Sequence, residues 1–401
     1  MADLDTRCCI AGGGPAGMML GLLLARAGID VVVLEKHGDF LRDFRGDTVH
    51  PSTMEVMHEL GLLDAFLTRP HSKVRELGAQ IGDEFIMVAD FSHLPTQAKF
   101  IAFMPQWEFL DFLSGEGKRY PGFHLLMRTE ATGLLREAGG VVGITAHGPE
   151  GDFAIRAPLV VAADGRHSTL RDAAGFKVLD IGAPMDILWL RLSKSSRDPG
   201  QTLGHIDAGR MFIMLDRDDY WQCAFIIPKG GIDQVHAIGL EAFRAEIAAL
   251  VPSLTDRVHE IATWDDVKLL TVAVNRLETW SEPGLLCIGD AAHAMSPVGG
   301  VGINLAVQDA VATANILVPR LRQNAVTQDD LRAVQRHREP PTRKTQRLQV
   351  MIQNKVISNV LGRTTKPKPP FAMKFLRWLP ILRRLPARII GMGFLPEHIR
   401  H

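Results

Sequence analysis

The stretch TRCCIAGGGPAGMMLGLLLARAGIDVVVLEK, residues 6 to 36, decides the first part of the fold. A short apolar run leads into the glycine segment GGGPAG at residues 12 to 17, and a helical pattern follows from 18 to 26. Gly28 ends this helix, and the run VVVLE at residues 31 to 35 is typical of a buried strand that ends on an acid. The order of strand, glycine turn, helix, strand and acid predicts a dinucleotide-binding unit.

Each glycine of the G-x-G-x-x-G pattern has its own physical role. Gly12 allows the tight turn, Gly14 lets a pyrophosphate approach the backbone, and Gly17 lets the helix pack closely on its strand. Glu35 lies 18 residues after Gly17, close to the spacing of roughly 20 at which an acid meets a ribose hydroxyl. The cofactor-binding residues predicted in this unit are Gly12, Gly14, Pro15, Ala16, Gly17, Glu35 and Lys36.

Size and composition narrow the class of protein. A chain of 401 residues, 46% of them hydrophobic, is long enough for two domains. The formal net charge is zero, so no nucleic-acid partner is expected. The four cysteines show neither metal-site nor disulfide spacing, so no metal is predicted. There is no signal-like start and no apolar stretch near the roughly 18 residues of a membrane span, which favours a cytoplasmic protein.

Two further strands end in ligand-type turns. The run LVVAA at residues 159 to 163 leads into Asp164-Gly165, and GLLCI at residues 284 to 288 leads into Gly289-Asp290. The segment PVGGVGIN, residues 297 to 304, then forms a glycine-rich turn before a long helix. Because open α/β sheets bind ligands at the carboxyl ends of their strands, we expect these motifs to meet the first glycine turn at one site.

Together the three motifs resemble those of the single-component FAD-dependent aromatic hydroxylases, the class A flavoprotein monooxygenases related to para-hydroxybenzoate hydroxylase. The resemblance covers roughly residues 6 to 345. It implies an α/β fold in which a Rossmann-like FAD-binding domain carries an inserted β-sheet substrate domain and C-terminal helices. The expected boundaries are 1–73, 105–180 and 278–345 for the FAD-binding domain, 74–104 and 181–277 for the substrate domain, and 346–401 for the C-terminal helical region.

The resemblance also implies roles for the residues of the later motifs. Asp164 and Gly165 would lie near the pyrophosphates, Gly289 and Asp290 would hold the ribityl chain, and Arg45 and Gln106 match positions that contact FAD. The glycine-rich turn would lie beside the isoalloxazine ring, where backbone N–H groups at a helix N-terminus stabilise the negative charge of the reduced flavin. The residues predicted there are Pro297, Gly299 and Gly300 for catalysis and Gly300, Val301, Gly302, Ile303 and Asn304 for the cofactor.

The implied reaction uses NADH or NADPH to reduce FAD. Molecular oxygen then gives a flavin C4a-hydroperoxide, which hydroxylates an aromatic or polycyclic phenolic small molecule. The nicotinamide cofactor would bind transiently, since there is one dinucleotide unit for two dinucleotides. The sequence does not distinguish a monomer from a homodimer.

Candidate substrate residues lie in β-patterned stretches between 187 and 227. We predict that the pocket is lined by Arg191, Arg210, Met214, Trp221 and Gln222, with Trp189 as a further candidate; ordinary packing is the alternative for each. The chain has two tyrosines, and neither falls in a recognisable motif, so the phenol-activating residue would be His205 or His293. For His293 the alternative is a structural contact with Asp290.

The C-terminal segment is basic and amphipathic between residues 371 and 395. One interpretation is a weak contact with an anionic membrane surface, which would suit a lipophilic substrate. The other is a helix pair docked on the same chain, which we favour because Pro380, Pro386 and Pro396 divide the segment into short pieces.

Three other functions remain to be compared. A flavin-dependent halogenase would share the fold, but its W-x-W-x-I-P signature is not matched after Trp221. A reductase or epoxidase of a lipophilic isoprenoid-type substrate is supported by the basic tail alone. A flavin-binding protein without turnover is the alternative outside the enzymes.

Overall fold

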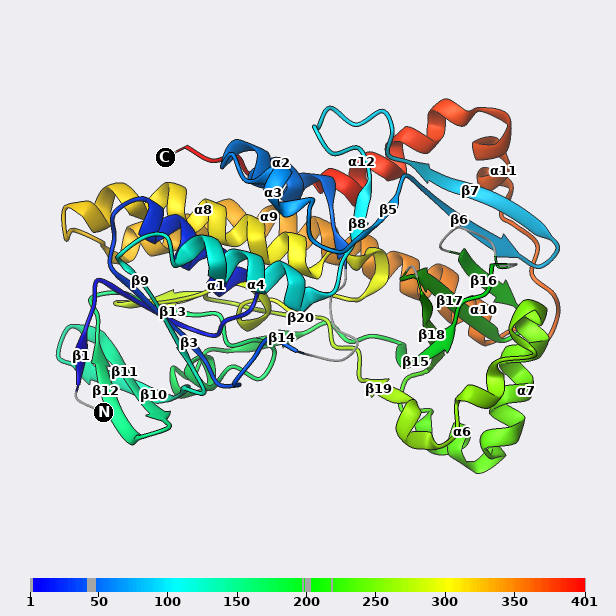
Figure 1. Ribbon diagram of the computed structural model, residues 1–401, viewed down its shortest axis with the longest axis horizontal. Coiled ribbons are helices and arrows are strands. Elements are labelled where there is room, and N and C mark those ends of the chain that lie inside the picture. The colour runs from blue at the N-terminus through cyan, green and yellow to red at the C-terminus, as the bar shows by residue number, and fades with distance from the viewer. Residues whose placement is uncertain (1–2, 42–47, 197, 199–202, 218, 401) are drawn as a thin grey trace.

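The computed structural model describes residues 3–41, 48–196, 198, 203–217 and 219–400. At its centre is a six-stranded sheet in the order β21-β22-β13-β2-β3-β9, in which the five strands from β22 to β9 run parallel (Figure 1). These strands are β2 (Cys8–Ala11), β3 (Val31–Glu35), β9 (Phe123–Met127), β13 (Val160–Ala162), β21 (Ser281–Glu282) and β22 (Leu285–Cys287). The strands β2, β3, β13 and β22 are buried along their whole length, as expected for a parallel sheet covered on both faces.

Four long helices lie together on one side of this sheet (Figure 1): α1 (Pro15–Arg26), α4 (Gln106–Gly117), α8 (Gly302–Arg322) and α9 (Gln328–Ile352). Contrary to the expectation from sequence, one segment that includes α8, Val298–Arg322, is apolar and long enough to cross a membrane; 78% of its apolar window is buried, as in the core helix of a domain. The other side carries a four-stranded sheet in the order β1-β12-β11-β10. Its strands are β1 (Leu4–Asp5), β10 (Glu130–Glu137), β11 (Gly140–Gly148) and β12 (Gly151–Arg156).

A seven-stranded sheet in the order β19-β15-β18-β17-β16-β6-β7 forms the second part of the molecule. Two distant segments of the chain contribute to it, and they join where β6 pairs parallel with β16. The strands are β6 (Glu76–Ile81), β7 (Glu84–Asp90), β15 (Met185–Ser193), β16 (Leu203–Asp207), β17 (Arg210–Asp216), β18 (Tyr220–Pro228) and β19 (Lys268–Leu270). Helices α6 (Ile232–Ile238) and α7 (Leu240–Leu250) cover one face (Figure 1).

Smaller elements connect the two parts. Strands β4 (Thr48–Val49), β5 (Ser72–Val74) and β8 (Ile101–Phe103) form one small sheet, and β14 (Val178–Asp180) pairs with β20 (Asn275–Leu277). Further helices are α2 (Pro51–Glu59), α3 (Leu63–Phe66), α5 (Thr169–Ala173), α10 (Ser358–Leu361), α11 (Phe371–Trp378), the short 3-10 helix η7 (Pro380–Arg383) and α12 (Arg384–Met392).

The predicted α/β fold with an inserted sheet and C-terminal helices is confirmed. The exact domain boundaries stay a prediction, and two of them fall at unexpected places. The boundary between residues 345 and 346 lies inside the continuous helix α9. Strand β8, which we assigned to the segment 74–104 of the substrate domain, pairs instead with β4 and β5.

Candidate active site

The first glycine turn is closely packed at Gly12 and Gly17 and open at Gly14, where a ligand is expected. A Cβ atom on Gly17 would lie 2.0 Å from the carbonyl oxygen of Gly12, and one on Gly12, where φ is +106°, would lie 2.3 Å from the carbonyl oxygen of Ala163. A Cβ atom on Gly14 would have no described atom within 4 Å. The turn therefore locks β2, α1 and the end of β13 together and leaves space in front of Gly14.

Glu35 ends β3 beside this turn and is buried. Its Oε1 accepts a hydrogen bond from the backbone N–H of His37 at 2.9 Å, and its other oxygen would lie 3.0 Å from a Cβ atom on Gly13. The predicted neighbour Lys36 is more than half exposed and lies 3.7 Å from Glu130. Glu35 is thus held beside the first glycine turn.

Asp164 carries an unsatisfied oxygen at the second turn. Its Oδ2 accepts a hydrogen bond from the N–H of Leu170 at 3.3 Å, while the buried Oδ1 has no hydrogen-bond partner among the described residues. Burial raises the pKa of the Asp164 carboxyl above its ordinary value. A buried acceptor without a donor fits a ligand hydroxyl, because a buried polar group is costly to leave unpaired. Gly165 follows with a φ of +87° and no described atom within 4 Å of an added Cβ.

The third turn packs directly on the first. A Cβ atom on Gly289, where φ is +59°, would lie 3.1 Å from the Cβ of Ala16. Asp290 follows on the same short turn, with its side chain 42% exposed and Oδ2 at 4.0 Å from Nε of Arg166. The three turns therefore converge on one site, as the sequence predicted.

Asp309 on α8 holds this third turn, and sequence reasoning missed it. Its fully buried carboxylate accepts a hydrogen bond from the backbone N–H of Gly289 at 3.0 Å and pairs with Nε2 of His293 at 2.6 Å and Nε of Arg338 at 3.0 Å. Burial alone would raise the pKa of Asp309, but the pairs with His293 and Arg338 outweigh it and lower that pKa. The sequence signal was one acid within the apolar part of a helix.

His293 is therefore bonded to Asp309 rather than exposed to a substrate. Arg338, the other side-chain partner of Asp309, also contacts Glu397: its Nη1 lies 3.1 Å from Oε1 of Glu397. The C-terminal end of the chain is in this way tied to the turn that carries Asp290.

The glycine-rich turn from Pro297 to Asn304 depends on positive φ angles, +82° at Gly299 and +63° at Gly300. Thr48 donates a hydrogen bond to the carbonyl of Gly300 at 2.7 Å, and the amide Nε2 of Gln349 donates to the carbonyl of Val298 at 2.8 Å. The turn is thus fixed on two sides, by strand β4 and by helix α9.

Asn304, at the end of this turn, has a structural role. Its Oδ1 accepts hydrogen bonds from the backbone N–H of His50 at 2.9 Å and from Oγ1 of Thr53 at 2.7 Å. Asn304 therefore fixes α8 to the start of α2. Since α8 begins at Gly302, the N–H groups of its first turn have no acceptor within the helix, and they lie at the positive end of its dipole.

Val298 of the glycine-rich turn packs against the inner face of the seven-stranded sheet. The same hydrophobic cluster contains side chains from β15, β16, β17 and β18: Met185, Ile187, Trp189, Ile206, Met211, Ile213, Ala224 and Ile226. The indole Nε1 of Trp189 is buried and has no hydrogen-bond partner within the described part of the chain. This apolar wall with one unpaired donor lies next to the turn predicted to carry the isoalloxazine ring.

Three predicted substrate-domain residues lie on the opposite face of the same sheet. His205 is the cross-strand neighbour of Phe212, and Met214 and Trp221 join Phe212 in the cluster beneath α7. Since side chains alternate along a strand, a shift of one residue moves a side chain to the other face. The structure therefore places His205, Met214 and Trp221 away from the glycine-rich turn.

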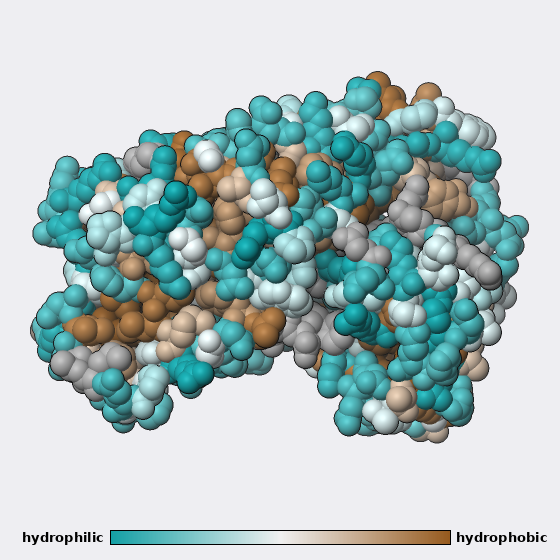
Figure 2. Space-filling model, viewed as in Figure 1, coloured by the Kyte–Doolittle hydropathy of each residue, from teal (hydrophilic) through white to brown (hydrophobic). Residues whose placement is uncertain are grey.

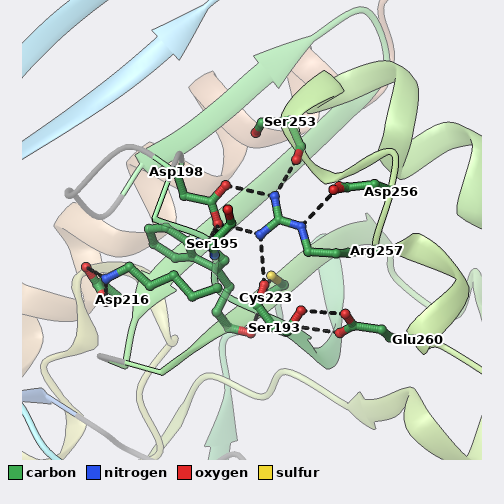
Figure 3. A network of polar contacts seen from close by, with 11 residues as sticks. Ser193, Ser195, Asp198, Asp216, Cys223, Ser253, Asp256, Arg257 and Glu260 are labelled. Carbon is green, nitrogen blue, oxygen red and sulfur yellow. Dashed lines mark hydrogen bonds and ion pairs between the residues drawn. The ribbon is translucent and has the colours of Figure 1, made fainter.

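Trp221 also belongs to a polar network that anchors the start of the connection after β15. Its Nε1 donates to Oδ2 of Asp198 at 2.7 Å, and Arg257 binds the same carboxylate through both terminal nitrogens (Figure 3). The Arg257 pair is the main cause that lowers the pKa of Asp198. These contacts explain the position of Trp221 without any role in substrate binding.

The remaining predicted contacts are scattered. Arg191 is exposed and stacks on the ring of Tyr220, with its guanidinium carbon 3.9 Å from the ring centroid. Arg210 is opposite Asp207 at the turn between β16 and β17. Gln222 lies on the inner face, but its Oε1 accepts from Nε of Arg217 at 2.9 Å. Gln106 begins α4, and Arg45 lies outside the described residues.

Three turns around one space, a helix N-terminus and an adjoining apolar sheet define a flavoprotein of the Rossmann type with a substrate domain. A family model described as FAD binding domain matches residues 5–347. The chain belongs to this family of class A flavin monooxygenases and is an FAD-dependent monooxygenase, as the sequence predicted.

Individual relatives agree with this assignment. The chain is 31% identical over 388 residues to 6-methylpretetramide 4-monooxygenase of Streptomyces rimosus, which covers 96% of this chain and 92% of the relative. A mutant of PqsL from P. aeruginosa has a TM-score of 0.77 at 21% identity, covering 90% of this chain and 97% of that chain. OxyS anhydrotetracycline hydroxylase from Streptomyces rimosus has a TM-score of 0.75 at 22% identity, covering 97% and 76%. These two structures share the fold with this chain.

Proposed function

We propose that this monooxygenase hydroxylates an aromatic or polycyclic phenolic small molecule, with molecular oxygen as oxidant and NADH or NADPH as electron donor. The observation that carries the proposal is the contact of Val298 with the inner face of the seven-stranded sheet. The relative named 6-methylpretetramide 4-monooxygenase supports a substrate of this class.

The residues around the three turns fit FAD. The open space before Gly14 would take the pyrophosphate, Glu35 the adenosine ribose, and Asp290 the ribityl chain. The N–H groups at the start of α8 would hold the ring. When bound, FAD supplies the electron transfer and the activation of oxygen.

The protein's own contribution to the reaction is to position the substrate and exclude water. The apolar inner face, on which Ile357 and Leu361 also pack, would supply hydrophobic contacts to a flat aromatic ring. The unpaired Nε1–H of Trp189 would donate a hydrogen bond to a substrate oxygen and fix the ring's orientation. Together they would hold one carbon of the ring beside Val298 and the glycine-rich turn.

The other candidate functions have less support. The assignment to the FAD-dependent monooxygenases disfavours a binding protein without turnover. An epoxidase of a lipophilic substrate would be recognised by an epoxide product. For the whole protein we propose a cytoplasmic monomer or homodimer.

The test compares Trp189→Phe with Trp221→Phe on the FAD-loaded enzyme. With a panel of phenols, the intact enzyme should release a product heavier by one oxygen atom. Trp189→Phe should raise KM about tenfold, which corresponds to about 1.4 kcal/mol, and leave flavin content unchanged. Trp221→Phe should lower stability and leave KM unchanged. Oxidation of NADH or NADPH without an oxygenated product from any phenol would contradict the proposal.

A further inference from the structure

Hydrophobic side chains gather on the surface of the C-terminal helices. Of the fifteen exposed large hydrophobic residues in the described part of the chain, eight lie within residues 375 to 395. They are Phe375, Trp378, Leu379, Ile381, Leu382, Leu385, Phe394 and Leu395. In Figure 2 hydrophobic residues interrupt the hydrophilic surface along the upper right edge, where Figure 1 places α11 and α12. Such a patch on a folded protein usually marks an interaction surface.

This segment is anchored, so its exposed side chains are not those of a loose tail. Ala387 of α12 is fully buried in a cluster with Phe91 and Leu94, and a Cβ atom on Gly391 would lie 2.8 Å from Cδ1 of Leu94. Nδ1 of His50 donates a hydrogen bond to the carbonyl of Ile390 at 2.7 Å. The docked helix pair favoured from sequence is therefore present, and docking leaves the apolar side chains outside.

The exposed side chains reach well into solvent. Trp378 is 67% exposed, Ile381 62% and Leu385 65%. Arg377, Arg384 and Arg388 are exposed among them, and the sequence has no acidic residue from 361 to 396. Apolar side chains with a tryptophan and a cationic border are the combination that binds the interface of an anionic bilayer.

We propose that α11, η7 and α12 dock this protein on the surface of an anionic lipid bilayer. The helices lie on the bilayer and do not span it, because α11 has 8 residues and α12 has 9, against about 20 for a spanning helix. A second copy of the chain suits this face less well, since a twofold contact would bring its arginines together.

An apolar cavity of about 200 Å³ adjoins α12 of the docking segment. Ile389, Ile390 and Met392 of α12 line it, and so do Gly299 and Val301 of the glycine-rich turn. The lipid-facing segment and the candidate active site therefore share the walls of one cavity. Docking itself is independent of the proposed reaction.

The experiment is co-sedimentation of the full-length, FAD-loaded protein with phosphatidylcholine vesicles that contain phosphatidylglycerol, and with phosphatidylcholine vesicles alone. One variant combines Trp378→Ser, Ile381→Ser and Leu385→Ser, and another combines Arg377→Gln, Arg384→Gln and Arg388→Gln. The matched control combines Ile238→Ser and Leu269→Ser, which replace side chains that are 47% and 44% exposed elsewhere. Circular dichroism and flavin content show that each variant is folded.

The intact protein and the control should bind the anionic vesicles, more weakly at high salt. Each triple variant should bind them at least about tenfold more weakly, since both the apolar and the cationic contribution are needed. An intact protein that stays in the supernatant, or an apolar triple variant that binds like the intact protein, would overturn the proposal. So would a dimer that the apolar variant converts to a monomer in sedimentation velocity without any vesicle binding.

Discussion

Asp309 and Arg338 form a buried ion pair, with Oδ1 and Nε 3.0 Å apart and side-chain exposures of 0% and 1%. One carboxylate oxygen binds Arg338, and the other accepts from the backbone of Gly289. The pair therefore joins α8, α9 and the turn that carries Asp290.

Replacing Asp309 with Ala should destabilise the protein. Arg338 would keep Glu397 as its carboxylate partner but lose Asp309, and both His293 and the N–H of Gly289 would lose their acceptor, so the cost should lie at or below the roughly 3–5 kcal/mol typical of a broken buried ion pair. We expect this loss in the free energy of unfolding, measured in urea, together with less FAD per protein. Asp309→Asn keeps an acceptor for the N–H of Gly289, so its free energy of unfolding should lie between those of the wild type and Asp309→Ala. A wild-type unfolding free energy for Asp309→Ala would contradict this account.

Asp290→Ala should separate cofactor binding from stability. Because its side chain is 42% exposed, its loss should leave unfolding in the cofactor-free state almost unchanged. If Asp290 bonds the ribityl chain, the variant should purify with much less FAD, and Asp290→Asn should retain more. Full flavin occupancy in Asp290→Ala would exclude the assignment.

Two glycine variants in one turn test where the pyrophosphate lies. Gly17→Ala places a Cβ atom 2.0 Å from the carbonyl oxygen of Gly12 and should cost about 1–3 kcal/mol even without FAD. Gly14→Ala meets no described atom within 4 Å, so the cofactor-free protein should keep its stability. Its added methyl group would occupy the ligand space, and FAD affinity should fall about tenfold, or about 1.4 kcal/mol. Equal FAD affinity in Gly14→Ala and the wild type would show that the pyrophosphate does not lie against Gly14.

Glu35→Ala should discriminate between flavins. Glu35 is expected to meet the adenosine ribose, which FMN lacks, so the variant should weaken FAD binding and leave FMN binding unchanged. The dissociation constants of both flavins can be measured by quenching of flavin fluorescence. An equal loss for FAD and FMN would count against the ribose contact.

His50 should make stability depend on pH. Burial lowers the pKa of His50 to about 4, whereas an unfolded histidine titrates near 6.5. Below about pH 6.5 the unfolded state binds a proton that the folded state does not bind, so the unfolding free energy falls as pH decreases and levels off below about pH 4. The full effect is about 3 kcal/mol.

The control for this pH dependence is His58, an exposed histidine of α2, the helix that follows His50. In urea titrations between about pH 7 and about pH 4, His50→Gln should flatten the decline, because it removes the buried titrating group. His58→Gln should leave the decline as it is, since His58 is exposed. A decline of the same size in His50→Gln would assign it to other groups.

The sequence by itself determined the Rossmann-type unit and the three ligand turns. These features are local: Gly12 and Gly17 are required by contacts within the turn and the adjoining strand end, and the buried strands appear as continuous apolar runs. The positions of Glu35, Asp164 and Asp290 follow, because Glu35 ends β3 and the other two come two and three residues after β13 and β22.

Only the tertiary structure decided which side chains of the second sheet face the site. Trp189 and Trp221 are the same residue type on neighbouring strands, yet they lie on opposite faces, because the face depends on strand register and on which helices cover the sheet. Asp309 was missed for a related reason: its partners Gly289 and Arg338 come from other elements that only folding brings together. A periodic pattern fixes an element and its glycines, whereas long-range packing selects the residues that meet across elements.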